Sequence, residues 1–152
     1  MKKSIAFCLV IATGILFGGC SKKSNNTTFT STMTATVGGN SFTSNSTGAV
    51  QGTVGGINDL TITGKNNSIL IVIDVWGYNN ATGIFPIDTI SSSGGSTASY
   101  NPGSTLSTQK SAVHGNVTIT AVSSGGVISG TFNFVASDST NVSGGNFAVK
   151  PL

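Results

Sequence analysis

The sequence predicts an all-β protein: a single antiparallel β-sandwich or flattened barrel of about eight to ten short strands, following a cleaved signal peptide. Apolar residues alternate with Thr, Ser and Asn over short runs, which is typical of strands with one buried face. Glycine-rich turn sequences separate these runs at close spacing. No segment after residue 20 repeats apolar residues at the period of an amphipathic helix. The close turns favour hairpins, and they leave sandwich and barrel both open.

The N-terminal segment has the pattern of a signal peptide. Lys2 and Lys3 form a short basic start, and an apolar run follows over residues 5–17, interrupted only by Thr13 and Gly14. Thirteen residues of helix span about 20 Å, which is short of the hydrocarbon core of about 30 Å. The run therefore fits the apolar part of a secretory signal better than a permanent transmembrane helix.

The apolar run ends at residues 17–20 (FGGC), where two small residues directly precede Cys20. This segment resembles the lipobox of bacterial lipoproteins, with Phe17 at a position where Leu is usual. We expect cleavage after residue 19 and acylation of Cys20 by chains such as palmitate; the competing interpretation is an ordinary signal with an incidental cysteine. Several acyl chains, at about 0.8 kcal/mol for each buried methylene, would hold Cys20 to a membrane. Cys8 leaves with the signal, so we expect no disulfide in the mature chain.

The predicted organisation has three parts. Residues 1–19 are the lipoprotein signal peptide, residues 20–32 are the lipidated cysteine with a polar tether of low complexity, and residues 33–152 are the all-β domain. Removing 19 of the 152 residues leaves 133, a length that suits one domain with its own core.

The mature chain carries little charge. Lys2 and Lys3 depart with the signal, which leaves five lysines against four aspartates, with no Arg and no Glu. A nucleic-acid partner would need clustered cations along its phosphates, so we expect none. Lys22 and Lys23 lie beside the anchor, where we expect them to meet anionic lipid headgroups or to keep the tether solvated.

The domain is predicted to open with a hairpin. Residues 33–37 alternate, residues 38–40 (GGN) supply a turn, and Phe42 begins the return strand. A short strand is expected at 51–54, broken by the glycine pair at 55–56.

The central strand is predicted at residues 69–76 (ILIVIDVW), behind an alternating run at 60–63 and a turn at 64–67. Its β-branched residues and the flanking turns favour strand over helix. Both of its faces are largely apolar. We therefore expect it to be buried on both faces, or to be central with a ligand or second layer above it.

The remaining elements follow in chain order. Residues 77–87 are predicted to form a turn and an edge strand with Pro86, and residues 91–99 a Ser/Gly loop. Residues 100–110 are weakly patterned, with a turn at Pro102-Gly103. Strands are then expected over 117–122 and 127–136 around a turn at 123–126, followed by a loop over 137–143 and a last strand around Phe147 and Val149.

Three C-terminal segments resemble the pattern of a known family. They are residues 115–120 (GNVTIT), 128–134 (ISGTFNF) and 145–147 (GNF), and the opening hairpin at 34–42 is similar as well. The family is a domain of Bacteroidota lipoproteins with the pattern G-x-[VI]-T-I-T, then I-S-G-T-F-x-F, then G-x-F. The resemblance implies a small, lipid-anchored all-β domain of unassigned function, and it supplies no catalytic residue. We interpret the motif as architecture, with Gly130 at a bulge or a close backbone approach.

The sequence offers little to a catalytic or metal site. His114 is the sole histidine, no G-x-S-x-G motif occurs, and the four aspartates are isolated along the chain. We therefore expect no catalytic residue, no cofactor and no metal, and a hydrolase ranks third among the functions considered. Calcium at Asn58-Asp59 or at Asp138 would need several more oxygens.

A ligand-binding face is the stronger alternative. Trp76 and Tyr78 are two residues apart, so on a continuing strand they would share a face and could stack on a sugar ring. Asn79 and Asn80 are nearby for its hydroxyls. If Gly77 turns the strand, Trp76 instead caps the core and Tyr78 packs beside it, and this is the interpretation that we favour.

The expected function is a non-catalytic binding or structural role in the cell envelope, with a carbohydrate- or peptide-binding surface module as the alternative. The expected partners are the membrane, through lipidated Cys20, and an envelope protein or a glycan. Ser21 stands where an Asp retains many lipoproteins in the inner membrane, so we expect the outer membrane. The residues after Cys20 lack an acidic surface-export cluster, which favours the periplasmic leaflet over the surface.

Overall fold

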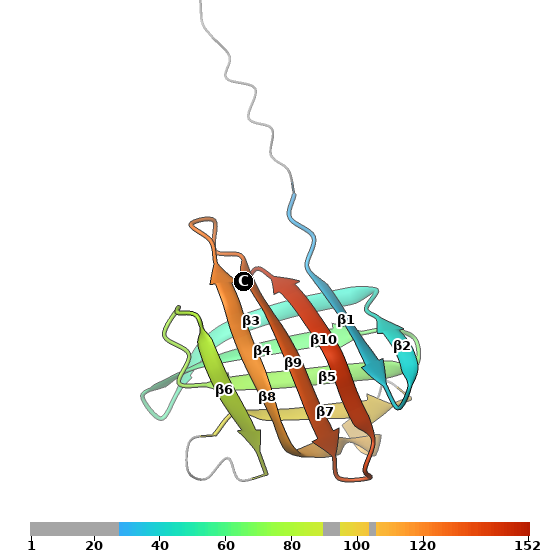
Figure 1. Cartoon of the computed structure of the whole chain (residues 1–152). Helices are drawn as coiled ribbons and strands as arrows, with labels where there is room; N and C mark the ends of the chain where they lie inside the picture. The colour runs from blue at the N-terminus through green and yellow to red at the C-terminus, as the bar shows by residue number, and fades with distance from the viewer. Residues whose placement is uncertain (1–27, 90–94, 104–105) are drawn as a thin grey trace, which may run out of the picture.

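The computed structural model describes residues 28–89, 95–103 and 106–152 (Figure 1). Cys20, the predicted signal peptide and most of the predicted tether lie outside these residues. Among the residues described, none forms a helix with the length and apolar character needed to cross a membrane.

Ten strands form one antiparallel sheet. Their order across the sheet is β2-β1-β10-β9-β8-β7-β5-β4-β3, and β6 pairs with β8 beside this path. The strands are β1 (Thr32–Val37), β2 (Asn40–Thr43), β3 (Ser46–Val54), β4 (Ile57–Lys65), β5 (Ile69–Trp76), β6 (Gly83–Asp88), β7 (Thr97–Pro102), β8 (Lys110–Val122), β9 (Ile128–Ala136) and β10 (Asn141–Val149). The prediction of an all-β fold with about eight to ten antiparallel strands is confirmed.

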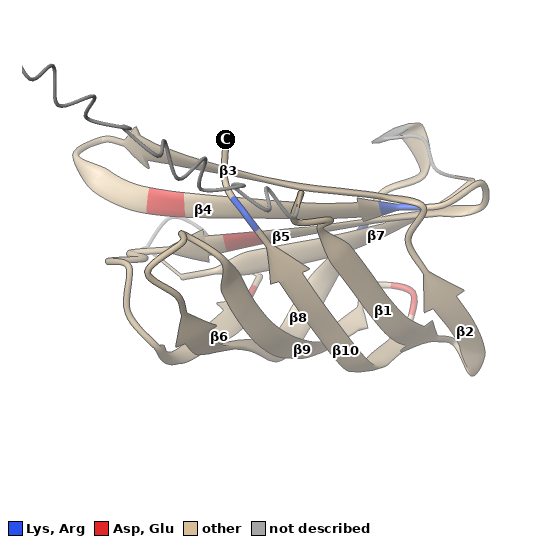
Figure 2. Cartoon of the chain, turned by 90° about the horizontal axis from the view of Figure 1, so that it is seen from above, with Lys and Arg blue, Asp and Glu red and all other residues tan. Residues whose placement is uncertain are grey.

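The sheet curls into a half-barrel whose two halves face each other. We call β2, β1, β10, β9, β8 and β6 the front half, and β7, β5, β4 and β3, which cross behind them in Figure 1, the rear half. Figure 2 shows the two halves as separate layers. β8 joins them, because Lys110 and Ser111 pair with β7 while residues 114–119 pair with β6 and β9. A bulge between Ala112 and His114 lies where the strand passes from one half to the other.

The core lies between the two halves and is built from the inward residues of both. The rear half supplies Leu60, Ile62, Ile71, Ile73 and Val75, and the front half supplies Met33, Phe42, Val117, Ile119, Phe132, Phe134, Val142, Phe147 and Val149. Because side chains alternate along a strand, every second residue of these strands is left for the outer surface.

Three glycines of the front half lie directly opposite phenylalanines of the neighbouring strand. Gly115 is opposite Phe134, Gly130 is opposite Phe147, and Gly145 is opposite Phe132. A Cβ at Gly130 would clash with the ring of Phe147 and with the carbonyl oxygen of Thr118. The close backbone approach expected at Gly130 is therefore present, and the glycines leave room for the aromatic layer of the core.

The turn predicted at 64–67 is wrong in position. Gly64 continues β4 and is buried, and a Cβ there would clash with the sulfur of Met33 from the front half. The turn begins at Asn66, whose Oδ1 accepts a hydrogen bond of 2.9 Å from the backbone N–H of Ser68.

Two predicted loops contain strand. β7 begins at Thr97, within the loop expected over 91–99, and β10 begins at Asn141, within the loop expected over 137–143. β3 is also longer than expected, because it begins at Ser46. These segments are rich in Ser, Thr, Gly, Ala and Asn, which give little strand signal, and pairing with the neighbouring strands decides their conformation.

β5 has the predicted bounds, Ile69–Trp76, but it is buried on one face only. Its inward residues Ile71, Ile73 and Val75 are fully buried, and its outward residues, Leu70, Val72, Asp74 and Trp76, are half-buried. In the described part of the chain no second layer covers these outward residues. The expectation that both faces are buried is therefore wrong, and β5 is a central strand with a partly open outer face.

The two ends of the domain lie at the same end of the half-barrel. The start of β1 and the C-terminus are both at the top of Figure 1. The backbone N–H of Lys150 donates to the hydroxyl of Ser31 at 3.4 Å, and that of Leu152 donates to the carbonyl oxygen of Ala49 in β3 at 3.3 Å.

Candidate functional site

The outer face of the rear half gathers polar residues that are far apart in the sequence. The strand register across β3, β4, β5 and β7 sets them in two adjacent rows: Gly52, Asp59 and Trp76, then Val50, Thr61, Asp74 and Thr97. The two carboxylates thus stand on neighbouring strands, one row apart. Figure 2 shows acidic positions on both β4 and β5.

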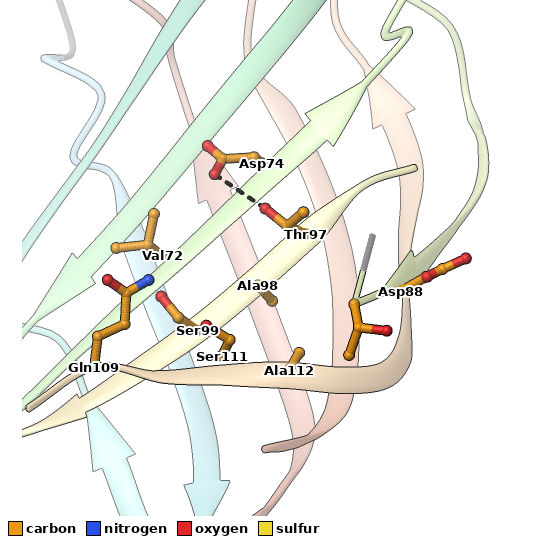
Figure 3. Close-up of a pocket in the computed structure, with 10 residues that line it drawn as sticks. Val72, Asp74, Asp88, Thr97, Ala98, Ser99, Gln109, Ser111 and Ala112 are labelled. Carbon is orange, nitrogen blue, oxygen red and sulfur yellow. Dashed lines mark hydrogen bonds between the residues drawn. The ribbon is translucent and has the colours of Figure 1, made fainter. Parts of the chain in front are cut away.

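Two clefts on this outer face meet at Asp74. The Asp88 cleft, drawn in Figure 3, has a volume of about 280 Å³ and lies between Val72, Asp88, Ser99 and Ser111. The Trp76 cleft has a volume of about 340 Å³ and is lined by Asp59, Asp74, Trp76, Gly95 and Thr97. Both volumes are near the lower end of the range for small-molecule sites, about 300–1,000 Å³.

The carboxylates of Asp59 and Asp74 influence each other. Burial raises the pKa of Asp59, and the negative charge of Asp74 raises it further, while the hydrogen bond from Thr61 opposes both effects. The Thr61 hydroxyl donates to Asp59 Oδ2 at 3.3 Å, and the Thr97 hydroxyl donates to Asp74 Oδ2 at 3.3 Å (Figure 3). Among the residues that the structure describes, no lysine forms an ion pair with either carboxylate, so this face attracts cations and neutral donors and repels anions.

Two polar atoms in the Trp76 cleft have no hydrogen-bond partner. They are Asp59 Oδ1 and Trp76 Nε1, and both are shielded from solvent although their residues are only half-buried. Most shielded polar atoms in folded proteins are paired, and leaving one unpaired costs about 1–3 kcal/mol. A group that pairs with both atoms would therefore be held in this cleft.

The structure does not bring Trp76 and Tyr78 together on one exposed face. Trp76 ends β5 on the outer face, and Gly77 then adopts a φ of 75°, with its N–H donating to the carbonyl oxygen of Asn58 at 2.8 Å. Tyr78 is 1% exposed, and its ring packs edge-on against Phe85 with the centroids 6.4 Å apart. The aromatic neighbour expected beside Trp76 is therefore turned into the molecule.

Asn79 and Asn80 are held by the β3–β4 hairpin. Asn58 Nδ2 donates to Asn79 Oδ1 at 3.0 Å, and Gln51 Nε2 donates to Asn80 Oδ1 at 2.8 Å. These side-chain bonds fix the turn that follows β5. Neither Asn79 nor Asn80 lines the Trp76 cleft, although Asn80 and Asp59 together line part of a neighbouring cleft.

The other residues considered for chemistry are dispersed. His114 is exposed in β8, opposite Asp88 of β6. Asp138 accepts a hydrogen bond of 2.6 Å from the hydroxyl of Tyr100, which lowers the pKa of Asp138. Across the described ranges, no three His, Cys, Asp or Glu side chains are grouped as they would be around a metal ion.

Sequence reasoning missed Asp59 and Asp74 as neighbours of Trp76. A signal for them existed, because residues paired across a hairpin are equidistant from its turn. With the turn centred between Asn67 and Ser68, Asp59 falls opposite Trp76, as the register shows. The predicted turn at 64–67 was centred two residues too early, and that error separated the pair.

One family model matches most of the chain. It is described as "Domain of unknown function (DUF6252)" and matches residues 25–150. The chain belongs to the DUF6252 family. The match begins before β1 and ends after β10, so the half-barrel as a whole is the DUF6252 domain. Comparison of this DUF6252 chain with curated proteins and with solved structures gave no match.

Proposed function

We propose that this DUF6252 protein is a lipid-anchored, non-catalytic binding domain of the cell envelope. The observation that carries the binding role is the Trp76 cleft, where an unpaired indole N–H and an unpaired carboxylate oxygen lie on directly opposed residues, Trp76 and Asp59. Neither atom has a hydrogen-bond partner within the folded chain, and a bound ligand would satisfy both.

The anchor is proposed from the N-terminal segment. Residues 17–20 (FGGC) follow an apolar run of signal-peptide length, and acylated Cys20 would hold the domain at a membrane. Eleven residues separate Cys20 from β1, and fully extended they span at most about 35–40 Å. That reach lets the rear half stand clear of the lipid headgroups.

The outer membrane is the proposed location, with the periplasmic leaflet ahead of the surface. Ser21 in place of Asp supports release from the inner membrane, and the lack of an acidic cluster after Cys20 supports the periplasmic side. The resemblance of residues 115–120 and 128–134 to Bacteroidota lipoprotein domains supports the lipid anchor.

Metabolic labelling with a palmitate analogue tests the anchor. We expect label on the wild-type protein and on Cys8→Ala, because Cys8 leaves with the signal, and no label on Cys20→Ala. The Cys20→Ala protein should also move from the membrane to the soluble fraction of the envelope. Label that persists in Cys20→Ala, or wild-type protein without label, would contradict the anchor.

A peptide ligand is the second candidate. Within the described ranges, no strand pairs with the outer edge of β3, which is contacted there only through the Leu152–Ala49 hydrogen bond. Val50 and Val54 of this edge strand are 56% and 54% exposed. An extended peptide could add to β3 as a further strand. Capture of the lipidated protein from its own envelope, comparing wild type with Val50→Lys, tests this candidate: a partner lost in Val50→Lys supports strand addition.

A further inference from the structure

The two unpaired atoms of the Trp76 cleft are chemically complementary. Asp59 and Trp76 are directly opposed in the antiparallel register, so their Cβ atoms are about 4.5–5.5 Å apart. Trp76 Nε1 is a donor only, and Asp59 Oδ1 in the ionised carboxylate is an acceptor only. The two atoms are themselves shielded from solvent, while their side chains are only half-buried, so pairing with a group in the cleft requires a rotation of these side chains.

A hydroxyl group is the simplest partner for both atoms. It can accept the indole N–H through its oxygen and donate its own proton to the carboxylate at the same time. A cation has no acceptor for the N–H of Trp76. An anion has no proton to donate to Asp59, and the charges of Asp59 and Asp74 repel it.

The surroundings supply space and further polar groups for such a ligand. Gly52 flanks Asp59 on the side away from Trp76, and nothing lies within 4 Å of the position that a Cβ would take there. On the other side, the hydroxyl of Thr97 and the carboxylate of Asp74 complete the lining. The indole ring adds an apolar surface that suits the C–H face of a sugar ring.

We infer that the Trp76 cleft binds a neutral, hydroxyl-rich ligand of the size of a sugar ring, a residue of an uncharged glycan. Trp76 and Asp59 hold one hydroxyl between them, and Asp74 and Thr97 receive a neighbouring one. This inference rests on the proposed binding function and deepens it, because it names the ligand class. It moves the glycan face from the pair Trp76 and Tyr78 to the row formed by Asp59 and Trp76.

Trp76 is the sole tryptophan of the chain, so its fluorescence reports directly on the cleft. The test titrates the mature lipidated protein in detergent with neutral gluco-, manno- and galacto-oligosaccharides. A parallel set contains uronic acid and sulfated oligosaccharides. We expect a saturable fluorescence change with at least one neutral oligosaccharide and none with the anionic set.

Two variants test the indole N–H of Trp76 and the carboxylate of Asp59 separately. Binding is measured by calorimetry, because Trp76→Phe removes the fluorophore. Trp76→Phe keeps an aromatic ring but loses the N–H, so binding should weaken about tenfold. Asp59→Ala loses a charged acceptor and should weaken binding about tenfold to a hundredfold. Ile84→Ala, at a 69% exposed position on β6 of the front half, should bind as wild type.

Thermal unfolding of each variant shows whether it is folded before its affinity is compared. Neutral binding that Trp76→Phe and Asp59→Ala do not weaken would overturn the assignment to this cleft. Binding of anionic glycans only, or capture of a peptide partner that needs Val50, would overturn the ligand class and leave the binding function standing. Absence of binding in every titration, together with no captured partner, would overturn both.

Discussion

Two effects destabilise the ionised carboxylate of Asp59. Burial and the charge of Asp74 both raise the pKa of its carboxyl, and only the hydrogen bonds from Thr61 and from the backbone of Leu60 oppose them. A carboxyl whose pKa is raised on folding binds its proton more tightly in the folded state. The stability that Asp59 contributes is therefore fully present when the pH is below the pKa of the unfolded state, near 3.9. It is lost as the pH rises through the pKa of the folded state.

Replacement of Asp59 by Asn removes this pH-dependent penalty. We expect Asp59→Asn to be more stable than the wild type at pH 7 and to lose that advantage at about pH 3, where the wild-type carboxyl is protonated. Thermal unfolding of both proteins between these pH values measures the difference. An Asp59→Asn protein that is less stable than wild type at pH 7 would contradict the cause assigned to the raised pKa. Stability kept low at this position is consistent with a binding role for Asp59.

At the scale of strands, the glycine–phenylalanine pairs explain the most specific part of the sequence. The segments ISGTFNF and GNF each contribute a glycine that faces a ring and a phenylalanine that faces a glycine. Phe132 and Phe147 are stacked at 6.4 Å, and Phe132 and Phe134 are stacked at the same distance. The interpretation of this motif as architecture agrees with these contacts.

Gly130→Ala tests this arrangement. Its Cβ would meet the Phe147 ring and the backbone of Thr118, so β9 must shift, and we expect a loss of about 1–3 kcal/mol in the free energy of unfolding. Gly52→Ala is the matched control, because its Cβ meets nothing within 4 Å, and it should change stability by about 0.5 kcal/mol or less. Chemical denaturation measures both. Equal effects of the two substitutions would contradict a steric role for Gly130.

The sequence predicts individual strands far better than their pairing. The bounds of β5 are predicted correctly because its run of β-branched residues favours a strand without reference to its neighbours. β7 is missed because its Thr, Ala and Ser residues acquire strand structure only by pairing with β5. The Trp76 cleft depends on the register between β4 and β5, so a turn misplaced by two residues hides it. A site assembled across strands therefore needs the three-dimensional pairing, whereas the fold class does not.

Over the whole molecule, stability comes from apolar packing and backbone hydrogen bonds. Among the residues that the structure describes, no ion pair is formed, and Figure 2 shows only scattered charged positions. The repulsion between Asp59 and Asp74 acts between half-buried groups, whereas the attraction of Lys110 for Asp138 acts on an exposed carboxylate and is the weaker of the two; salt would weaken both.

The melting temperature should therefore respond weakly to salt. Between about 0.01 M and 0.5 M NaCl we expect little change, with a slight increase as the Asp59–Asp74 repulsion is screened. Calorimetry at the two salt concentrations measures the change, and Asp59→Asn should abolish the increase. A marked fall in the melting temperature at high salt would indicate stabilising ion pairs and contradict this account.

The two ends of the domain meet at Ser31 and Lys150, and this has a consequence for connectivity. A short linker between these ends would close the chain into a ring, and the ring could be opened at the exposed glycine pair Gly55-Gly56 between β3 and β4. Every strand pair would survive this circular permutation, since only a two-residue turn is cut. The pairing of neighbouring strands thus defines the half-barrel, and we expect the same fold when the polypeptide begins at residue 56 instead of before β1.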